Sequence, residues 1–147
     1  MATELELALF DEELVTVRCL AEASRWKLER DAACPLGLFA EMYPRSKPTE
    51  LYKAHIRWTD YFGPPSLKFA SFATGSETDP TAWPRCFGFR PASFDACLPW
   101  TAEGHGLHPD WKNSSKNGFP KVDAPMQFAL LQIQHSLDTT YEGRGSP

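Results

Sequence analysis

The sequence predicts an α+β domain with an N-terminal helix, a small antiparallel meander sheet, a long irregular loop segment and a C-terminal helix. Apolar residues recur at helical spacing near both ends of the chain. From about residue 26 to residue 71, apolar and polar residues alternate instead, which is typical of half-buried strands. The stretch 74–120, rich in Gly, Pro, Asn and Ser, follows neither period.

Length and composition narrow the class of protein. With 147 residues, 42% of them hydrophobic, the chain is long enough for one buried core. We expect a single domain over residues 1–140 and a flexible tail over 141–147. The net charge of -4 argues against a general nucleic-acid binder, which usually presents a basic face.

Cellular location is inferred from what the sequence lacks. No apolar run approaches the roughly 18 residues that a membrane span needs, and the acidic N-terminus does not follow the pattern of a signal peptide. The four cysteines are widely spaced. We therefore expect a cytoplasmic protein with reduced thiols and no contact with membranes.

The first helix has a clear start signal. Thr3 and Glu6 have the spacing of a capping box, in which each side chain accepts a hydrogen bond from the backbone N–H of the other residue. An apolar stripe follows, formed by Leu5, Leu9, Phe10, Leu14, Val17 and Ala21. These features predict a helix from about Thr3 to Ala21.

The alternating segments predict three or four strands. They occupy about residues 26–42 (interrupted near Pro35), 52–58 and 67–71. The solvent-facing positions of the middle segment are Lys53, His55 and Arg57. Short turns between consecutive strands favour an antiparallel meander. We expect His55, and His135 in the last helix, to have no chemical role.

The last helix also carries recognisable boundary residues. Asp123 is a good N-cap, and Pro125 suits a first helical turn, where a missing N–H costs nothing. Apolar residues then repeat at intervals of three and four, at Met126, Ala129, Leu130, Ile133 and Leu137. A helix is predicted from about Ala124 to Thr139.

Cys97 lies in the middle of the irregular segment, and two histidines, His105 and His108, follow it closely. Loops of this length in a compact domain are usually either functional or disordered. Trp100 and Trp111 flank the histidines and argue against disorder. The region around Cys97 is therefore the candidate site.

The order of elements and two local motifs resemble the ubiquitin-conjugating enzyme family. Tyr61–Phe69, with its paired prolines, is similar to the stretch leading into the strand before the family's active-site loop. Ala96-Cys97-Leu98 resembles the catalytic cysteine followed by leucine. The family's His-Pro-Asn before the cysteine is missing, whereas a His-Pro follows it at His108-Pro109. In these two respects the chain resembles divergent bacterial members of the family more than its familiar members. Those bacterial members are encoded with ubiquitin-like proteins and activating enzymes, a setting associated with antiphage defence.

The resemblance implies a transferase that carries a ubiquitin-like modifier as a thioester on Cys97. The partners are then the modifier, an activating enzyme that consumes the ATP, and a target protein that supplies an amine. No cofactor or metal is implied. His108 is the leading candidate for proton transfer and His105 the second, while Asn113 or Asn117 would support the oxyanion.

The family binds its activating enzyme on the first helix, so the resemblance also implies a docking face. Its candidate residues in this chain are Glu4, Glu12 and Glu13. Charge reversal there is expected to weaken loading.

Two alternatives remain open at this point. Cys86, Cys97, His105 and His108 offer two thiolates and two imidazoles for tetrahedral zinc, although no short Cys-x-x-Cys pair is present. The second alternative is a binding module that resembles the ubiquitin-conjugating fold but has lost the transfer activity. The missing His-Pro-Asn favours this alternative, and the presence of Cys97 opposes it.

Overall fold

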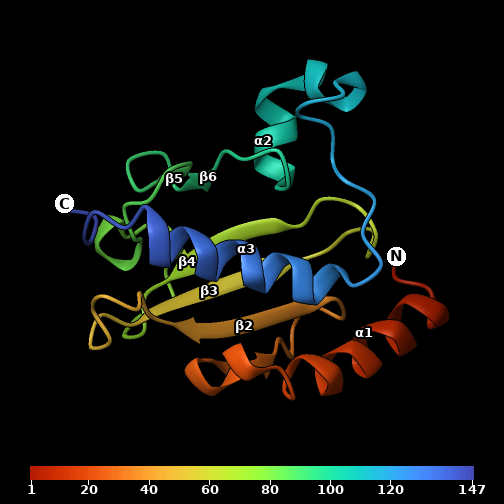
Figure 1. Cartoon of the computed structure of the whole chain (residues 1–147), viewed down its shortest axis with the longest axis horizontal. Helices are drawn as coiled ribbons and strands as arrows, with labels where there is room; N and C mark the ends of the chain where they lie inside the picture. The colour runs from red at the N-terminus through yellow and green to blue at the C-terminus, as the bar shows by residue number, and fades with distance from the viewer.

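The computed structural model describes all 147 residues and shows an α+β fold, as predicted (Figure 1). Its α-helices are α1 (Glu4–Val17), α2 (Ala102–Leu107) and α3 (Pro125–Thr139). Its strands are β1 (Lys27–Arg30), β2 (Gly37–Met42), β3 (Tyr52–Arg57), β4 (Ser66–Ala70), β5 (Phe89–Arg90) and β6 (Asp95–Ala96). Three short 3₁₀ helices are η1 (Ala21–Arg25), η2 (Pro80–Ala82) and η3 (Pro109–Asn113).

The first four strands form the predicted antiparallel meander, in the order β1-β2-β3-β4. In its register Ala40 faces Ala54, and Ile56 faces Leu67. Helix α3 crosses one face of this sheet, α1 runs along the β1–β2 side, and the β5–β6 hairpin lies beyond β4 (Figure 1). The candidate cysteine therefore belongs to the β4 side of the molecule.

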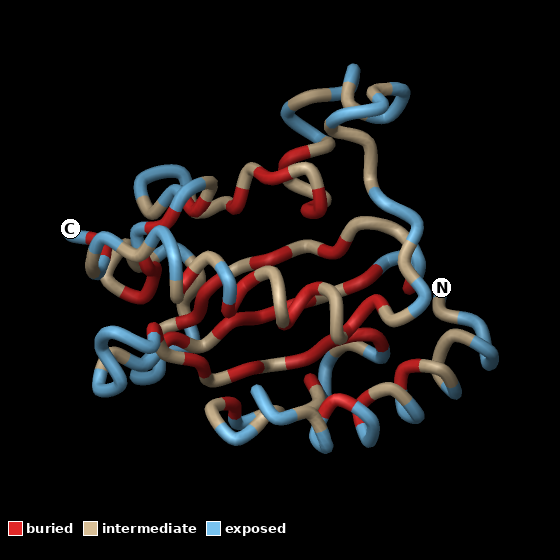
Figure 2. The backbone as a smooth tube through the Cα atoms, viewed as in Figure 1, coloured by how far each residue is buried: buried red, intermediate tan, exposed pale blue.

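The core lies between the sheet and α3. Side chains alternate along each strand, so that Leu38, Ile56 and Leu67 are fully buried, and they share the core with Leu130 and Ile133 of α3. Each such burial contributes roughly 1.5–3 kcal/mol relative to exposure. Figure 2 shows the buried residues concentrated along the strands, while the segment containing α2 and η3 projects away and is largely exposed.

Helix α1 starts as predicted but ends earlier. The Thr3–Glu6 capping box is present, yet the helix stops at Val17, and Ala21–Arg25 forms a separate 3₁₀ turn. The turn precedes Trp26, which is buried and donates a hydrogen bond from Nε1 to Oε1 of Gln134 in α3, at 2.9 Å. The contact between Trp26 and Gln134 fixes the path of the chain after α1. The helical spacing of the apolar residues up to Ala21 does not predict this contact, so it also does not predict where α1 ends.

Helix α3 has the predicted bounds but not the predicted cap. Asp123 makes no capping bond; the carboxylate of Glu13 in α1 accepts the N–H groups of Met126 and Gln127, at 3.2 Å and 2.8 Å. The same carboxylate accepts a hydrogen bond from the Tyr61 hydroxyl. A residue from another helix thus satisfies the free donors at the start of α3.

His55 is buried, so the prediction that it faces solvent is wrong. Its Nε2 lies 2.7 Å from Oδ2 of Asp31, and its Nδ1 lies 2.6 Å from Oε2 of Glu77. Its ring stacks on Phe39, with centroids 4.1 Å apart. Asp31 follows β1 and Glu77 follows β4, so two loops close over a position that strand alternation alone leaves open to water.

The sequence predicts a flexible tail for residues 141–147. In the structure this segment forms backbone hydrogen bonds with residues 83–85. Arg85 donates its N–H to the carbonyl of Gly143, and Gly145 donates to Trp83, both at 2.8 Å. The guanidinium of Arg144 stacks over the ring of Tyr52 at 4.3 Å. None of the helices combines the length and apolar character needed to cross a membrane.

Candidate functional site

Cys97 directly follows β6 and is half-buried. Its backbone N–H donates to the carbonyl of Gly88 at 2.8 Å, which extends the β5–β6 hairpin by one bond. Gly88 has φ +82°, and a Cβ there would lie 2.5 Å from a methyl carbon of Leu98. Both the left-handed backbone and the close approach of Leu98 therefore require glycine at this position.

The hairpin turn before Cys97 contains a conformation that side-chain-bearing residues rarely adopt. Phe94 has φ +56°, the one positive φ in the chain outside glycine. Such a residue costs roughly 1–2 kcal/mol and persists where its surroundings hold it. Here Lys68 of β4 donates from Nζ to the Phe94 carbonyl at 2.7 Å. The sheet thus fixes the turn that presents Cys97.

Thr101 holds the chain on both sides of Cys97 and was not identified from the sequence. Its side chain is fully buried, and its hydroxyl donates to the carbonyl of Ala96 at 2.5 Å. The same oxygen accepts the N–H groups of Leu98, at 3.3 Å, and Gly104, at 3.0 Å. Thr101 is the N-cap of α2, so a threonine opening a short helix was the signal that could have revealed it.

Helix α2 is tied to the start of β4, beside the paired prolines. Glu103 accepts hydrogen bonds from the N–H of Leu67, at 3.0 Å, and from the hydroxyl of Ser66, at 2.6 Å. Ala102 donates its N–H to the Pro65 carbonyl at 2.8 Å. The proline segment and the cysteine turn, 32 positions apart between Pro65 and Cys97, are therefore joined through the first turn of α2.

An ion pair links the two strands of the hairpin before Cys97. Arg90 of β5 binds Asp95 through two parallel bonds, Nε to Oδ1 at 2.6 Å and Nη2 to Oδ2 at 2.7 Å. The pKa of Arg90 is raised, chiefly by the hydrogen bond to Asp95 and further by the charge of that carboxylate. The guanidinium is thus paired with a carboxylate two positions before Cys97, and this pair joins the two strands of the hairpin.

The two candidate histidines lie on the projecting segment, and neither hydrogen-bonds the Cys97 thiol. Nε2 of His105 lies 2.6 Å from the Pro99 carbonyl, so this nitrogen carries the proton and braces the turn after Cys97. The ring of His108 stacks on Trp111, with centroids 4.2 Å apart and planes 13° apart. Trp111 also meets His105 edge to face, at 5.8 Å.

The proposed zinc ligands are not gathered. No group of three or more Cys, His, Asp or Glu side chains has a metal-binding arrangement. Cys86 is buried, which raises the pKa of its thiol to about 12 and keeps it protonated at neutral pH. The asparagine candidates also lie on the projecting segment, where Asn113 ends η3 and Asn117 donates its N–H to Ser114.

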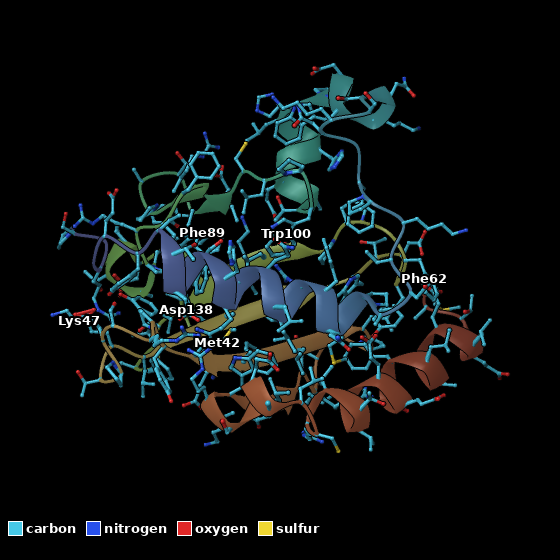
Figure 3. The ribbon with its side chains drawn as sticks, in the orientation of Figure 1. Met42, Lys47, Phe62, Phe89, Trp100 and Asp138 are labelled. Atoms are coloured by element: carbon cyan, nitrogen blue, oxygen red, sulfur yellow. The ribbon has the colours of Figure 1, made fainter.

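An open cleft of about 750 Å³ adjoins the cysteine turn. One wall contains Phe87, Leu98 and Trp100, the other contains α3, and the segment 112–120 closes one side. Leu98, which follows Cys97, and Phe87, which precedes its backbone partner Gly88, line the cleft, whereas the Cys97 side chain does not. In Figure 3 Trp100 lies between α2 and α3.

Comparison with known proteins yields no relative. No family model, no curated protein and no solved structure matches this chain.

Proposed function

We propose that this chain is a transferase of the ubiquitin-conjugating type, which carries a ubiquitin-like protein as a thioester on Cys97 and passes it to an amine of a target protein. The observation that carries the proposal is the construction around Cys97. A half-buried thiol directly follows a braced hairpin, and its chain neighbour Leu98 lines an open cleft. The element order and the contact between Pro65 and α2 further support the family resemblance.

The first step is an exchange of thioesters. The Cys97 thiolate attacks the carbonyl carbon of the modifier's C-terminus, which the activating enzyme holds as a thioester after consuming ATP. A new bond forms between that carbon and Sγ, the bond to the partner's sulfur breaks, and this sulfur leaves as a thiolate that takes up a proton. The attacking species is the thiolate rather than the thiol.

In the second step a target amine attacks the thioester on Cys97. The amine must lose a proton, and the tetrahedral oxyanion collapses to an amide while Sγ leaves as a thiolate. His108 is our candidate for the proton, because no hydrogen bond occupies its ring nitrogens in this structure. His105 instead supports the turn through Pro99, so we assign it a positioning role.

We place the docking face for the activating enzyme on α1, with one change from the sequence analysis. Glu4 and Glu12 are exposed, whereas the carboxylate of Glu13 is engaged by α3 and Tyr61. Charge reversal at Glu4 and Glu12 is expected to slow loading without unfolding the chain. Reversal at Glu13 acts on stability instead and does not report on docking.

The direct test uses a synthetic peptide thioester ending in Gly-Gly with mercaptoethanesulfonate as its leaving group. Wild-type protein is expected to gain the acyl mass on Cys97 and to lose it under reductant. Cys97→Ala abolishes the adduct, while Cys19→Ala, which removes an exposed thiol just after α1, leaves it unchanged. Acylation that persists in Cys97→Ala contradicts the proposal.

The same preparation separates the transferase from an inactive binding module of the same fold. A candidate ubiquitin-like protein and its activating enzyme are added with ATP. A reductant-sensitive conjugate of the modifier with the chain supports transfer. Stable association of the modifier with no covalent conjugate supports the module. We place either activity in the cytoplasm, where the free thiols remain reduced.

A further inference from the structure

The cleft between α3 and residues 112–120 has an aromatic floor that the transfer step does not use. Trp100 and Phe128 meet edge to face with ring centroids 6.4 Å apart, and Phe119 packs on Phe128 at the same distance. Phe87 stands at the rim with 76% of its surface exposed. An aromatic cleft of this size, open to solvent, is the usual setting for a ligand that carries a large apolar group.

Charge is distributed unevenly around this cleft. Its charged lining residues are Lys112 and Lys116, and no Asp or Glu lines it. The chain as a whole has 19 acidic residues against 15 basic ones. Neither lysine forms an ion pair within the protein. Serine hydroxyls complete the polar lining, at Ser114, Ser115 and Ser136. The hydroxyls of Thr139 and Thr140 also line it but donate to carbonyls within α3.

These features favour one kind of occupant. Two ammonium groups and the serine hydroxyls match one or two carboxylates, while the aromatic floor matches one large apolar side chain. A long polyanion fits less well, because the net charge of -4 repels it away from the cleft. We propose that the cleft between α3 and residues 112–120 binds an extended acidic peptide segment of a partner protein, with a large apolar side chain seated on Trp100 and Phe128.

Selection from random peptides tests the proposal directly, because the library contains every combination of acidic and apolar residues. A displayed library of random octapeptides is panned on the wild-type protein and, in parallel, on Lys112→Ala/Lys116→Ala. Sequences enriched on wild type are expected to combine an aromatic or aliphatic residue with one or two acidic residues. Removing both lysines should weaken the best peptide about ten-fold, the size expected for two exposed charge pairs.

The control is Lys121→Ala, which removes an exposed lysine just outside the cleft and should leave binding unchanged. Cys97→Ala should also bind normally, so loss of transfer and loss of peptide binding are distinguishable. The proposal is overturned if no sequence is enriched over the double variant, if the enriched peptides are basic, or if decathymidylate binds the cleft more tightly than any selected peptide.

Discussion

The thiol of Cys97 is presented by a small set of residues that each make a specific contact. The carbonyl of Gly88 accepts the backbone N–H of Cys97, and Lys68 donates to the carbonyl of Phe94 in the preceding turn. The Thr101 hydroxyl hydrogen-bonds the backbone of the residues on both sides of Cys97. These contacts fix the backbone of a nucleophile that would otherwise lie on a free loop. A fixed geometry is what attack on a partner's thioester needs.

Thr101→Val tests this bracing at nearly constant volume. It removes the bond to the Ala96 carbonyl and leaves the N–H groups of Leu98 and Gly104 without an acceptor. We expect a loss of about 1–3 kcal/mol in the free energy of unfolding, measured by urea denaturation. Thr101→Ser retains the hydroxyl and should lose much less; equal losses in the two variants would show that the hydroxyl is not what stabilises the turn.

Gly88→Ala is predicted to destabilise the hairpin because of its φ of +82° and the neighbouring Leu98 side chain. A loss of about 1–3 kcal/mol is expected in thermal or urea unfolding. Gly106→Ala is the matched control, since a Cβ there meets open space within α2. It should be neutral or slightly stabilising, and a comparable loss there would remove the structural explanation for Gly88.

Among the helices, α1 and α3 depend on one another through Glu13. The Glu13 carboxylate accepts the N–H groups of Met126 and Gln127, which lie 113 and 114 positions later in the sequence. The capping box of α1 was predictable because both partners lie within one turn. The cap of α3 was not, because its acceptor comes from a distant helix and a nearer candidate, Asp123, fits the local pattern equally well. For the same reason η1 and the burial of His55 depend on tertiary partners.

Glu13→Ala is predicted to destabilise the protein by removing that cap. The N–H groups of Met126 and Gln127 lose their acceptor, and about 1–2 kcal/mol of unfolding free energy should be lost. Glu12→Ala, which changes an exposed neighbour on the same helix, should have little effect. Circular dichroism during urea unfolding measures both; equal stability of the two variants would contradict the capping role.

At the scale of the whole molecule, the helix–meander–helix order was predictable because periodicity reports burial on one face at a time. The β5–β6 hairpin, α2 and the arrangement around Cys97 were not. They consist of two-residue strands and are held by single hydrogen bonds. Such short elements produce no periodic pattern of apolar residues in the sequence. Cys97, His105 and His108 were singled out from the sequence by their position in a long loop, while Thr101 and Gly88 emerged only from contacts.

The free energy of unfolding is expected to depend on pH in the acid range because of two carboxyl groups, those of Asp31 and Asp138. Burial acts to raise the pKa of the Asp31 carboxyl, but hydrogen bonds from Ala33 and His55 outweigh it and leave that pKa below its ordinary value. At Asp138 burial likewise acts to raise the pKa, and hydrogen bonds from Arg25, Arg45 and Gln134 outweigh it. A carboxyl whose pKa is lower in the folded state contributes stability above its unfolded pKa and loses it as the pH falls.

We therefore predict that unfolding free energy declines between about pH 5 and about pH 2, and that Asp31→Asn makes this decline shallower. Urea denaturation at several pH values measures the slope. Asp110→Asn changes an exposed residue that makes no hydrogen bond within the protein and should retain the wild-type slope. A wild-type slope in Asp31→Asn as well would show that this carboxyl does not couple folding to pH.

The decisive measurement for the role of Cys97 is the site of acylation after exposure to the Gly-Gly peptide thioester. Intact mass followed by peptide mapping identifies the modified residue and its sensitivity to reductant. We predict a single reductant-labile acyl group on Cys97, formed faster than on the exposed Cys19. Acylation of Cys19 at an equal or greater rate, or a Cys97 that remains unmodified, would contradict the assignment of Cys97 as the thioester carrier.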